Sequence, residues 1–94
     1  MGSKNMNKRA QKSELLTLMN IGPATHKDLI LLGITTIAQL ARQHPDELYE
    51  RLCKLTGVKH DPCVWDVFAA IIHEAQTGQK NPWWQWTKVR KAKF

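Results

Sequence analysis

The sequence predicts an all-α fold, a compact bundle of about five short helices. In residues 13–79, apolar side chains recur three and four positions apart, which is the spacing of one helix face. Glycine and proline divide this stretch into segments of helical length, with connections of two to five residues, as in a bundle of crossing helices. The β-branched run 34–37 is only four residues long and leads into a helical pattern, so we read it as a connection rather than a strand.

The first two helices are set by a polar cap and by proline. Ser13 is the expected N-cap of a first short helix over residues 14–19. Pro23 suits the first turn of a second helix, because a proline there gives up no intrahelical hydrogen bond, and this helix runs to about Leu32. Gly33 follows at the position where a left-handed C-cap is expected.

The third and fourth helices are also bounded by capping residues, proline and glycine. Thr35 or Thr36 caps a third helix over residues 37–43. His44-Pro45 opens a fourth helix, in which leucines recur at helical spacing, and Gly57 ends it.

The fifth helix is expected to be the most hydrophobic. Asp61 is a strong N-cap, Pro62 is tolerated at the first helical position, and Gly78 closes the helix. Asn81-Pro82 starts one more turn before a basic tail, Lys88–Lys93, which we expect to be disordered.

The formal net charge of +6 is unevenly distributed along the chain. Residues 1–12 hold four basic residues and no acid, residues 80–94 hold five basic residues and no acid, and residues 13–79 hold all eight acids with five basic residues. We therefore expect a flexible basic segment over 1–12, a folded domain over 13–79, and a Trp-rich basic segment over 80–94 that is partly packed. A polyanion would have to meet the two basic segments, a local patch, or backbone amides.

The pattern that most constrains function lies in residues 18–29 and 32–40. It is a hydrophobic-Gly-x-Gly-like turn between two short helices, followed by a Gly-Ile-Thr-Thr connection into the next helix. This resembles the helix-hairpin-helix motif. Gly22 matches the first glycine of that motif, whereas Ala24 stands at the second, where a positive φ would be costly for alanine.

Such a turn is suited to binding phosphate. It ends at a helix N-terminus, where backbone N–H groups lack intrahelical partners and the helix dipole favours an anion. Contacts to the nucleic-acid backbone rather than to base edges would be independent of sequence, and DNA is the expected partner ahead of RNA. The alternative is that the turn serves packing only. The expected contact residues are Gly22, Pro23, Ala24, Thr25, His26 and Lys27 in the turn, and Lys88, Arg90 and Lys91 in the C-terminal segment.

Three tryptophans precede the C-terminal basic run. They could stack on unpaired bases, or they could pack onto the helical body as a hydrophobic lid. We expect Trp83 to form part of such a lid. At least one of Trp84 and Trp86 should stay exposed, because a short segment does not easily turn all three rings inward.

The only candidate cluster of metal ligands that merits a test is Cys53, His60, Cys63 and His73, of which the first three are the candidate site. Their spacing is not a recognised zinc pattern, and free cysteines are often buried as small hydrophobic residues, so we expect no metal and no cofactor. No Ser/His/Asp constellation is apparent, and we expect no enzymatic activity. The absence of an export signal and of an apolar run near ~20 residues predicts a cytoplasmic protein that does not enter membranes.

A wider resemblance covers residues 13–86. The residues on which it rests are Ile21-Gly22-Pro23, residues 46–53, Asp61-Pro62-Cys63-Val64, Val67-Phe68 and Pro82-Trp83-Trp84. Over these residues the chain resembles the small bacterial proteins of the pathogenicity-locus, or mitomycin-resistance-protein-like, family. The resemblance implies a helix-hairpin-helix fold of the SAM-domain-like type, and it implies DNA binding mainly through the motif.

Two further hypotheses remain open. The glycine-containing connection over residues 55–62 could be a second, degenerate hairpin, which would make the domain a tandem pair. An acidic helical body with exposed tryptophans could also dock a partner protein, so a protein-interaction adaptor of SAM-like fold is the alternative function.

Overall fold

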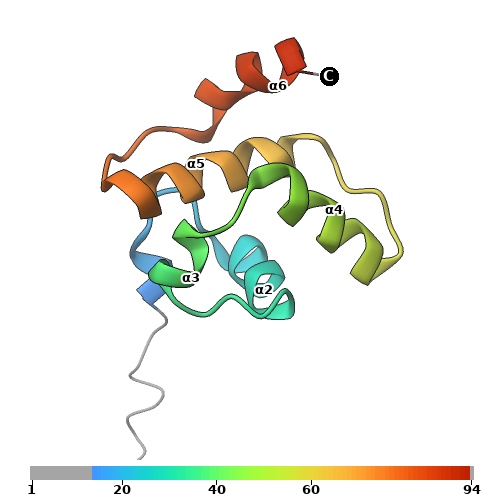
Figure 1. Ribbon diagram of the computed structural model, residues 1–94, viewed down its shortest axis with the longest axis horizontal. Coiled ribbons are helices and arrows are strands. Elements are labelled where there is room, and N and C mark those ends of the chain that lie inside the picture. The colour runs from blue at the N-terminus through green and yellow to red at the C-terminus, as the bar shows by residue number, and fades with distance from the viewer. Residues whose placement is uncertain (1–13, 94) are drawn as a thin grey trace, which may run out of the picture.

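The computed structural model describes residues 14–93 and confirms an all-α bundle over that range (Figure 1). Residues 1–12, predicted to be a flexible basic segment, and the predicted cap Ser13 lie outside the described residues. Two elements are short 3-10 helices, labelled η, and five are α-helices. In chain order they are η1 (Glu14–Thr17), α2 (Pro23–Leu31), α3 (Ile37–Ala41), α4 (Pro45–Thr56), α5 (Cys63–Thr77), η2 (Trp83–Trp86) and α6 (Thr87–Lys93).

The first element is shorter than the expected helix over 14–19. It is a single 3-10 turn, in which the Leu18 amide donates to the Leu15 carbonyl at 3.1 Å. The chain leaves the helix at this point because the Met19 amide is bonded elsewhere. It donates to Oε1 of Glu74, a buried residue of α5, at 2.8 Å.

Helix ends form largely where the sequence predicts them. Gly33 has φ +83° and lies at the end of α2, where the Ile34 amide donates back to the Leu29 carbonyl at 2.9 Å. Of the two threonines considered as caps for α3, the structure selects Thr36. Its hydroxyl accepts from the Gln39 amide at 3.1 Å while the Gln39 side chain accepts from the Thr36 amide, which is a complete capping box.

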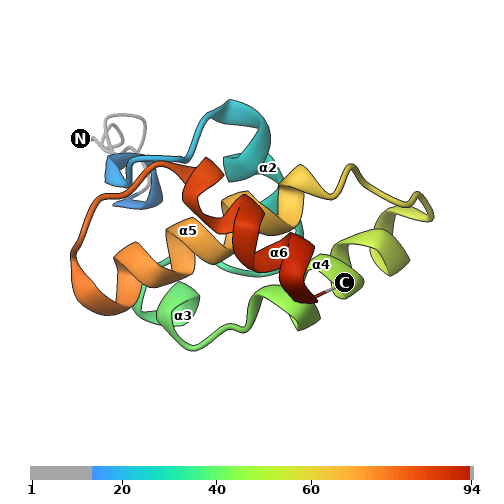
Figure 2. The same ribbon diagram turned by 90° about the horizontal axis from the view of Figure 1, so that it is seen from above.

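Helix α5 is the centre of the bundle. It contacts α3, α4, η2 and α6. Figure 1 shows η2 and α6 on one side of α5, with α2 and α3 on the other. In Figure 2, seen from above, α6 lies in front of α5, and α2 and α3 lie to either side of it. One apolar core joins these elements, and burying each of its large side chains stabilises the fold by about 1.5–3 kcal/mol. The core residues are Leu15, Leu18, Ile21, Leu29, Leu32, Ile34, Leu40, Leu48, Leu52, Phe68, Ile71 and Ile72.

The C-terminal basic run is helical, which corrects the expectation of a disordered tail over Lys88–Lys93. The side chain of Asp66 on α5 is fully buried and accepts from Arg90 Nε at 2.8 Å and from the Thr87 hydroxyl at 2.8 Å. Near the other end of α5, the buried carboxylate of Glu74 pairs with Lys80 Nζ at 2.9 Å. Two buried acids, which no local pattern marks, hold this segment against α5.

Candidate functional site

The start of α2 is open to solvent. Gly22 is the N-cap residue, and Pro23 occupies the first helical position, where it has no N–H to offer. The first intrahelical bond runs from the His26 amide to the Gly22 carbonyl at 2.9 Å. No side chain caps the helix, and the Ala24 and Thr25 amides have no acceptor among residues 14–93. These two N–H groups are therefore available to an external anion.

The side chains of this first turn differ in how far they reach solvent. Lys27 is exposed, whereas Thr25 and His26 are half-buried. The His26 Nε2 atom is buried and has no hydrogen-bond partner among the described residues. The first turn contains no acidic residue. Of the three side chains predicted to contact a ligand, Lys27 is the one fully presented to solvent.

Gly22 is not required by backbone conformation. Its φ of −97° and ψ of −174° are ordinary extended values, and an added Cβ would meet no atom within 4 Å. Ala24, which replaces the second glycine of the expected turn, lies within α2 and needs no positive φ. The glycine therefore keeps the space above the amides clear, and the alanine costs no backbone strain.

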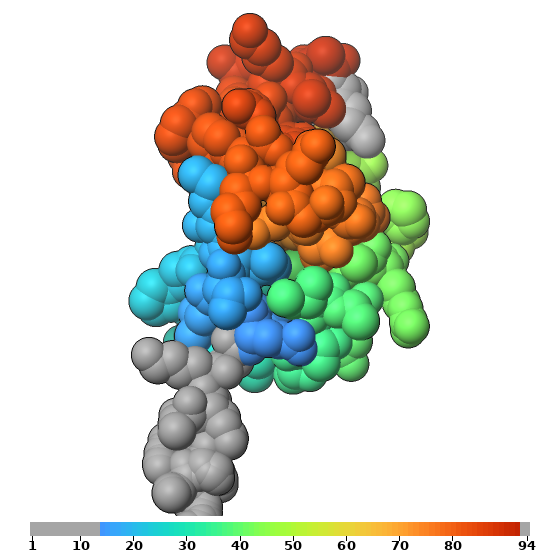
Figure 3. Space-filling model, turned by 90° about the vertical axis from the view of Figure 1, so that its left-hand side faces the viewer, coloured from blue at the N-terminus to red at the C-terminus, as the bar shows by residue number. Residues whose placement is uncertain are grey.

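Two hydrogen bonds of Asn20 join the Gly22 turn to the segment that follows α5. The Asn20 side chain donates to the Asn81 carbonyl at 2.8 Å and accepts from the Trp83 amide at 3.3 Å. Figure 3 shows the blue beginning of the described chain in contact with the orange segment that follows α5. Nothing in the local sequence marks this role of Asn20, since an asparagine in an Asn-Ile-Gly-Pro stretch also suits an ordinary turn.

The predicted cations of the C-terminal segment divide into two kinds. Lys88 and Lys91 are exposed. Arg90 is 18% exposed and lies against Asp66, and the hydrogen bond to that carboxylate raises the pKa of Arg90. Arg90 therefore holds α6 in place, and the two lysines are the residues left facing solvent.

The start of α5, where a second hairpin was considered, is capped from within. The Asp61 carboxylate accepts from the Cys63 amide at 2.9 Å, and this bond lowers the pKa of Asp61. The Asp61 carbonyl accepts from the Val64 amide at 2.9 Å. The connection before it ends α4 at Gly57, with φ +71°. An acid occupies the place where a phosphate would approach.

The candidate metal ligands make bonds within the connection between α4 and α5. The His60 amide donates to Cys53 Sγ at 3.5 Å, and His60 Nε2 lies 2.9 Å from the Thr56 hydroxyl. A hydrogen bond with Asp61 raises the pKa of the Cys63 thiol. Within the part of the chain that the structure describes, no three His, Cys, Asp or Glu side chains are grouped to hold a metal ion.

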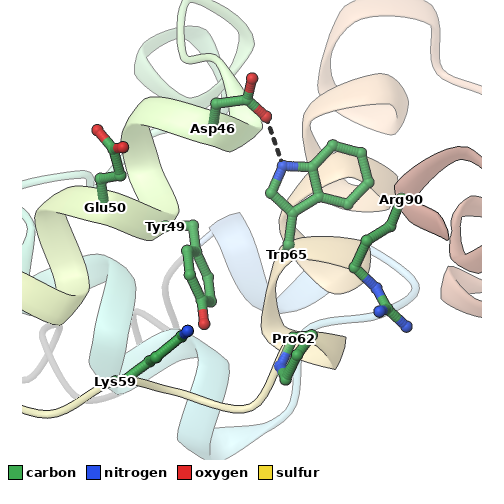
Figure 4. A pocket seen from close by; sticks show the side chains of 7 residues that line it. All are labelled: Asp46, Tyr49, Glu50, Lys59, Pro62, Trp65 and Arg90. Atoms are coloured by element: carbon green, nitrogen blue, oxygen red, sulfur yellow. Dashed lines mark hydrogen bonds between the residues drawn. The ribbon is translucent and has the colours of Figure 1, made fainter. Parts of the chain in front are cut away.

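A pocket of about 440 Å³ lies between α4, the connection to α5, and α6 (Figure 4). Two aromatic residues line it, and their polar atoms are bonded within the protein. Trp65 Nε1 donates to the Asp46 carboxylate at 2.7 Å, and the Tyr49 hydroxyl donates to the His60 carbonyl. Burial, followed by the nearby Cys53, raises the pKa of Tyr49. The lining residues are Asp46, Tyr49, Glu50, Lys59, Pro62, Trp65 and Arg90.

Taken together, the fold and the open turn define a small all-helical domain in which the start of α2 is exposed and has no side-chain cap. The chain belongs to the Pathogenicity locus family (Cdd1), whose sequence pattern matches residues 8–92. It is 39% identical over 79 residues to Mitomycin resistance protein McrB of Streptomyces lavendulae, an alignment covering 84% of this chain and 75% of that protein. No solved structure matches the chain. Among residues 14–93, no helix has the length and apolar character needed to cross a bilayer.

Proposed function

We propose that this protein is a non-catalytic module that binds the backbone of nucleic acid, DNA in preference to RNA, independently of sequence. In this proposal η1, the Gly22 turn and α2 act as a helix-hairpin-helix unit within a SAM-like bundle in the cytoplasm. The observation that carries it is the pair of uncapped amides on Ala24 and Thr25, which no group of the described chain occupies. Uncapped amides and the helix dipole together favour a phosphate oxygen.

Exposed lysines on α2 and α6 support the same proposal. Lys27 lies on the first turn of α2, and Lys88 and Lys91 are exposed on α6. The two acids buried beneath the C-terminal segment, Asp66 and Glu74, are paired with Arg90 and Lys80 and so add no uncompensated negative charge there. Binding through such groups should weaken steeply as salt rises, because each phosphate contact releases counterions.

The test exchanges the residue that faces the phosphate. Gly22→Asp places a carboxylate where it can accept from the Ala24 and Thr25 amides, as Asp61 does at the start of α5. The variant should fold at least as stably as the parent, because an N-cap acid stabilises a helix by a few tenths of a kcal/mol relative to glycine. Its affinity for a random-sequence duplex, measured by fluorescence anisotropy at low salt, should fall at least tenfold.

The matched control is Gly22→Asn, which caps the same amides without the negative charge. We expect its affinity to lie between those of the parent and Gly22→Asp. Equal affinities in all three proteins would place the binding site elsewhere. A folded parent protein that binds neither duplex nor single strand at low salt would refute the proposal altogether.

A protein-interaction adaptor is the second candidate function, and one surface supports it. Leu31 and Leu55 are each more than half exposed and line a depression of about 450 Å³ beside Arg51 and Lys54. Contiguous exposed apolar residues with a polar rim are typical of protein contacts. A pull-down after nuclease treatment should then recover a partner that Leu55→Asp loses and Gly22→Asp retains.

A further inference from the structure

The segment from η2 to α6 has two distinct faces. Trp83, Trp86, Thr87 and Arg90 are half-buried and follow one another at helical spacing toward α5. Trp84, Lys88 and Lys91, four and then three positions apart, are exposed. The inner face is fixed by the bonds of Thr87 and Arg90 to Asp66. The outer face therefore presents one aromatic ring and two cations on a helix that is held in place.

The side chain of Trp84 lies at the surface and does not pack into the core. It is 60% exposed, more than any other large hydrophobic side chain described as exposed. The Trp83 ring meets the Trp84 ring nearly at right angles, with centroids 5.9 Å apart and planes at 80°. Such an edge-to-face contact supports one side of an indole and leaves a face free for stacking.

The charge around Trp84 indicates an anionic ligand. Residues 80–94 contain no acid, and Lys88 and Lys91 follow Trp84 on the same face. Asp66 and Glu74, the acids to which this segment is bonded, are already paired with Arg90 and Lys80. A flat aromatic surface beside free lysines fits a nucleotide with an exposed base better than an apolar protein surface.

The position of Trp84 links it to the Gly22 turn. Asn20, two residues before Gly22, accepts from the amide of Trp83, the residue before Trp84. Figure 1 shows η2 and α2 on opposite sides of α5, so the link between the turn and the C-terminal segment runs through Asn20.

We infer that Trp84, Lys88 and Lys91 form a binding surface for unpaired nucleotides, with Trp84 stacking on a base and the lysines holding flanking phosphates. This inference rests on the proposed function and sharpens it. It names nucleic acid with unpaired bases, such as a single strand or a strand end, as the preferred ligand class over continuous duplex.

The experiment measures anisotropy with labelled oligothymidine and, separately, a random duplex, using the full chain. Trp84→Ala should weaken oligothymidine binding by about 5- to 150-fold, the range for loss of one stacked base, and should change duplex binding less than twofold. Trp84→Phe should keep most of the oligothymidine affinity, because a phenyl ring still stacks. Leu55→Ala, which trims an equally exposed side chain on α4, should change neither affinity.

Tryptophan fluorescence supplies a readout independent of affinity. Oligothymidine should quench part of the emission of the parent protein, and Trp84→Phe should remove that quenching. Equal loss of duplex and single-strand affinity in Trp84→Ala, or no loss in either, would overturn the inference. If Gly22→Asp still weakens duplex binding in that case, the proposed function stands without the stacking surface. If the parent binds oligothymidine through Trp84 but no duplex, the stacking surface stands and the role of the turn falls.

Discussion

The starts of α2 and α5 differ in one decisive residue. Each helix begins after a glycine-containing turn, and each has a proline at its first position or just before it. At α5 the residue before proline is Asp61, whose carboxylate accepts from the Cys63 amide at 2.9 Å. At α2 the residue before proline is Gly22, and the Ala24 and Thr25 amides have no partner among the described residues.

The comparison indicates that the residue before proline, and not the turn itself, determines whether a helix start can bind an anion. A carboxylate at the N-cap satisfies the free amides and repels phosphate, whereas glycine leaves them open. Gly-Pro and Asp-Pro look alike as helix openings, yet they give opposite local electrostatics. The second turn therefore contributes to stability, and in our proposal only the first contributes to binding.

The largest predicted effect concerns Asp66, the acid in the first turn of α5. Asp66→Ala should lower the free energy of unfolding by about 3 kcal/mol, because it strips Arg90 and Thr87 of a buried acceptor. Urea denaturation monitored by circular dichroism measures this loss. Unchanged stability would mean that these bonds of Asp66 do not hold α6 in place. The first turn of α5 would then resemble that of α2 in contributing little to stability through its polar groups.

The next effect compares the glycines of the two turns. Gly57 has φ +71°, so Gly57→Ala should cost about 1–2 kcal/mol. Gly22 has an extended backbone with free space around it, so Gly22→Ala should change stability by less than about 0.5 kcal/mol. Thermal melts of the two variants provide the measurement. Equal destabilisation would show that Gly22 also has a structural role.

The smallest effect is the pH response of the α5 cap. Because the folded protein lowers the pKa of Asp61 below its ordinary value of 3.8, the cap stabilises the fold fully above that value. Its contribution should fade as the pH drops through the lowered pKa. Asp61→Gly, which makes this start resemble that of α2, should flatten the acid limb of a stability-against-pH curve.

The same variant has a second, independent readout. The hydrogen bond with Asp61 is the main cause of the raised pKa of Cys63, so Asp61→Gly should lower that pKa. The pH dependence of thiol labelling, measured in a Cys53→Ser background, reports the change. An unaltered labelling profile would contradict the assigned hydrogen bond.

The helix boundaries and the open turn could be predicted because their causes are local. Gly33 ends α2 and Thr36 caps α3, each through groups within five positions along the chain. Asp61 accepts from the first amide of α5, as a local acid can, but the N-cap residue is Pro62 and not the predicted Asp61. An exposed ring at one or both of Trp84 and Trp86 was also predicted, and Trp84 is the exposed one. Patterns of this kind involve neighbours in sequence, which a linear analysis can weigh.

The long-range bonds could not be predicted in this way. Asp66 and Arg90 are 24 positions apart, and Met19 and Glu74 are 55 apart, so no spacing rule connects them. Without those partners, Arg90 looked like a free cation on a tail and Met19 like part of a longer first helix. Both errors have one cause: the buried acids of α5 bond to residues that only the tertiary structure brings close.

The bonds of Asn20 to the segment after α5 have a consequence for how the chain is made. Of the described residues, those from Lys80 onward leave the ribosome last, and until then Asp66 and Glu74 have no counter-charges to cover them. Until the same residues emerge, Asn20 also lacks its bonds to Asn81 and Trp83, which support the Gly22 turn. The nascent protein should therefore acquire its proposed phosphate-binding corner only once the residues from Lys80 to Arg90 have emerged, in the same step that closes the bundle.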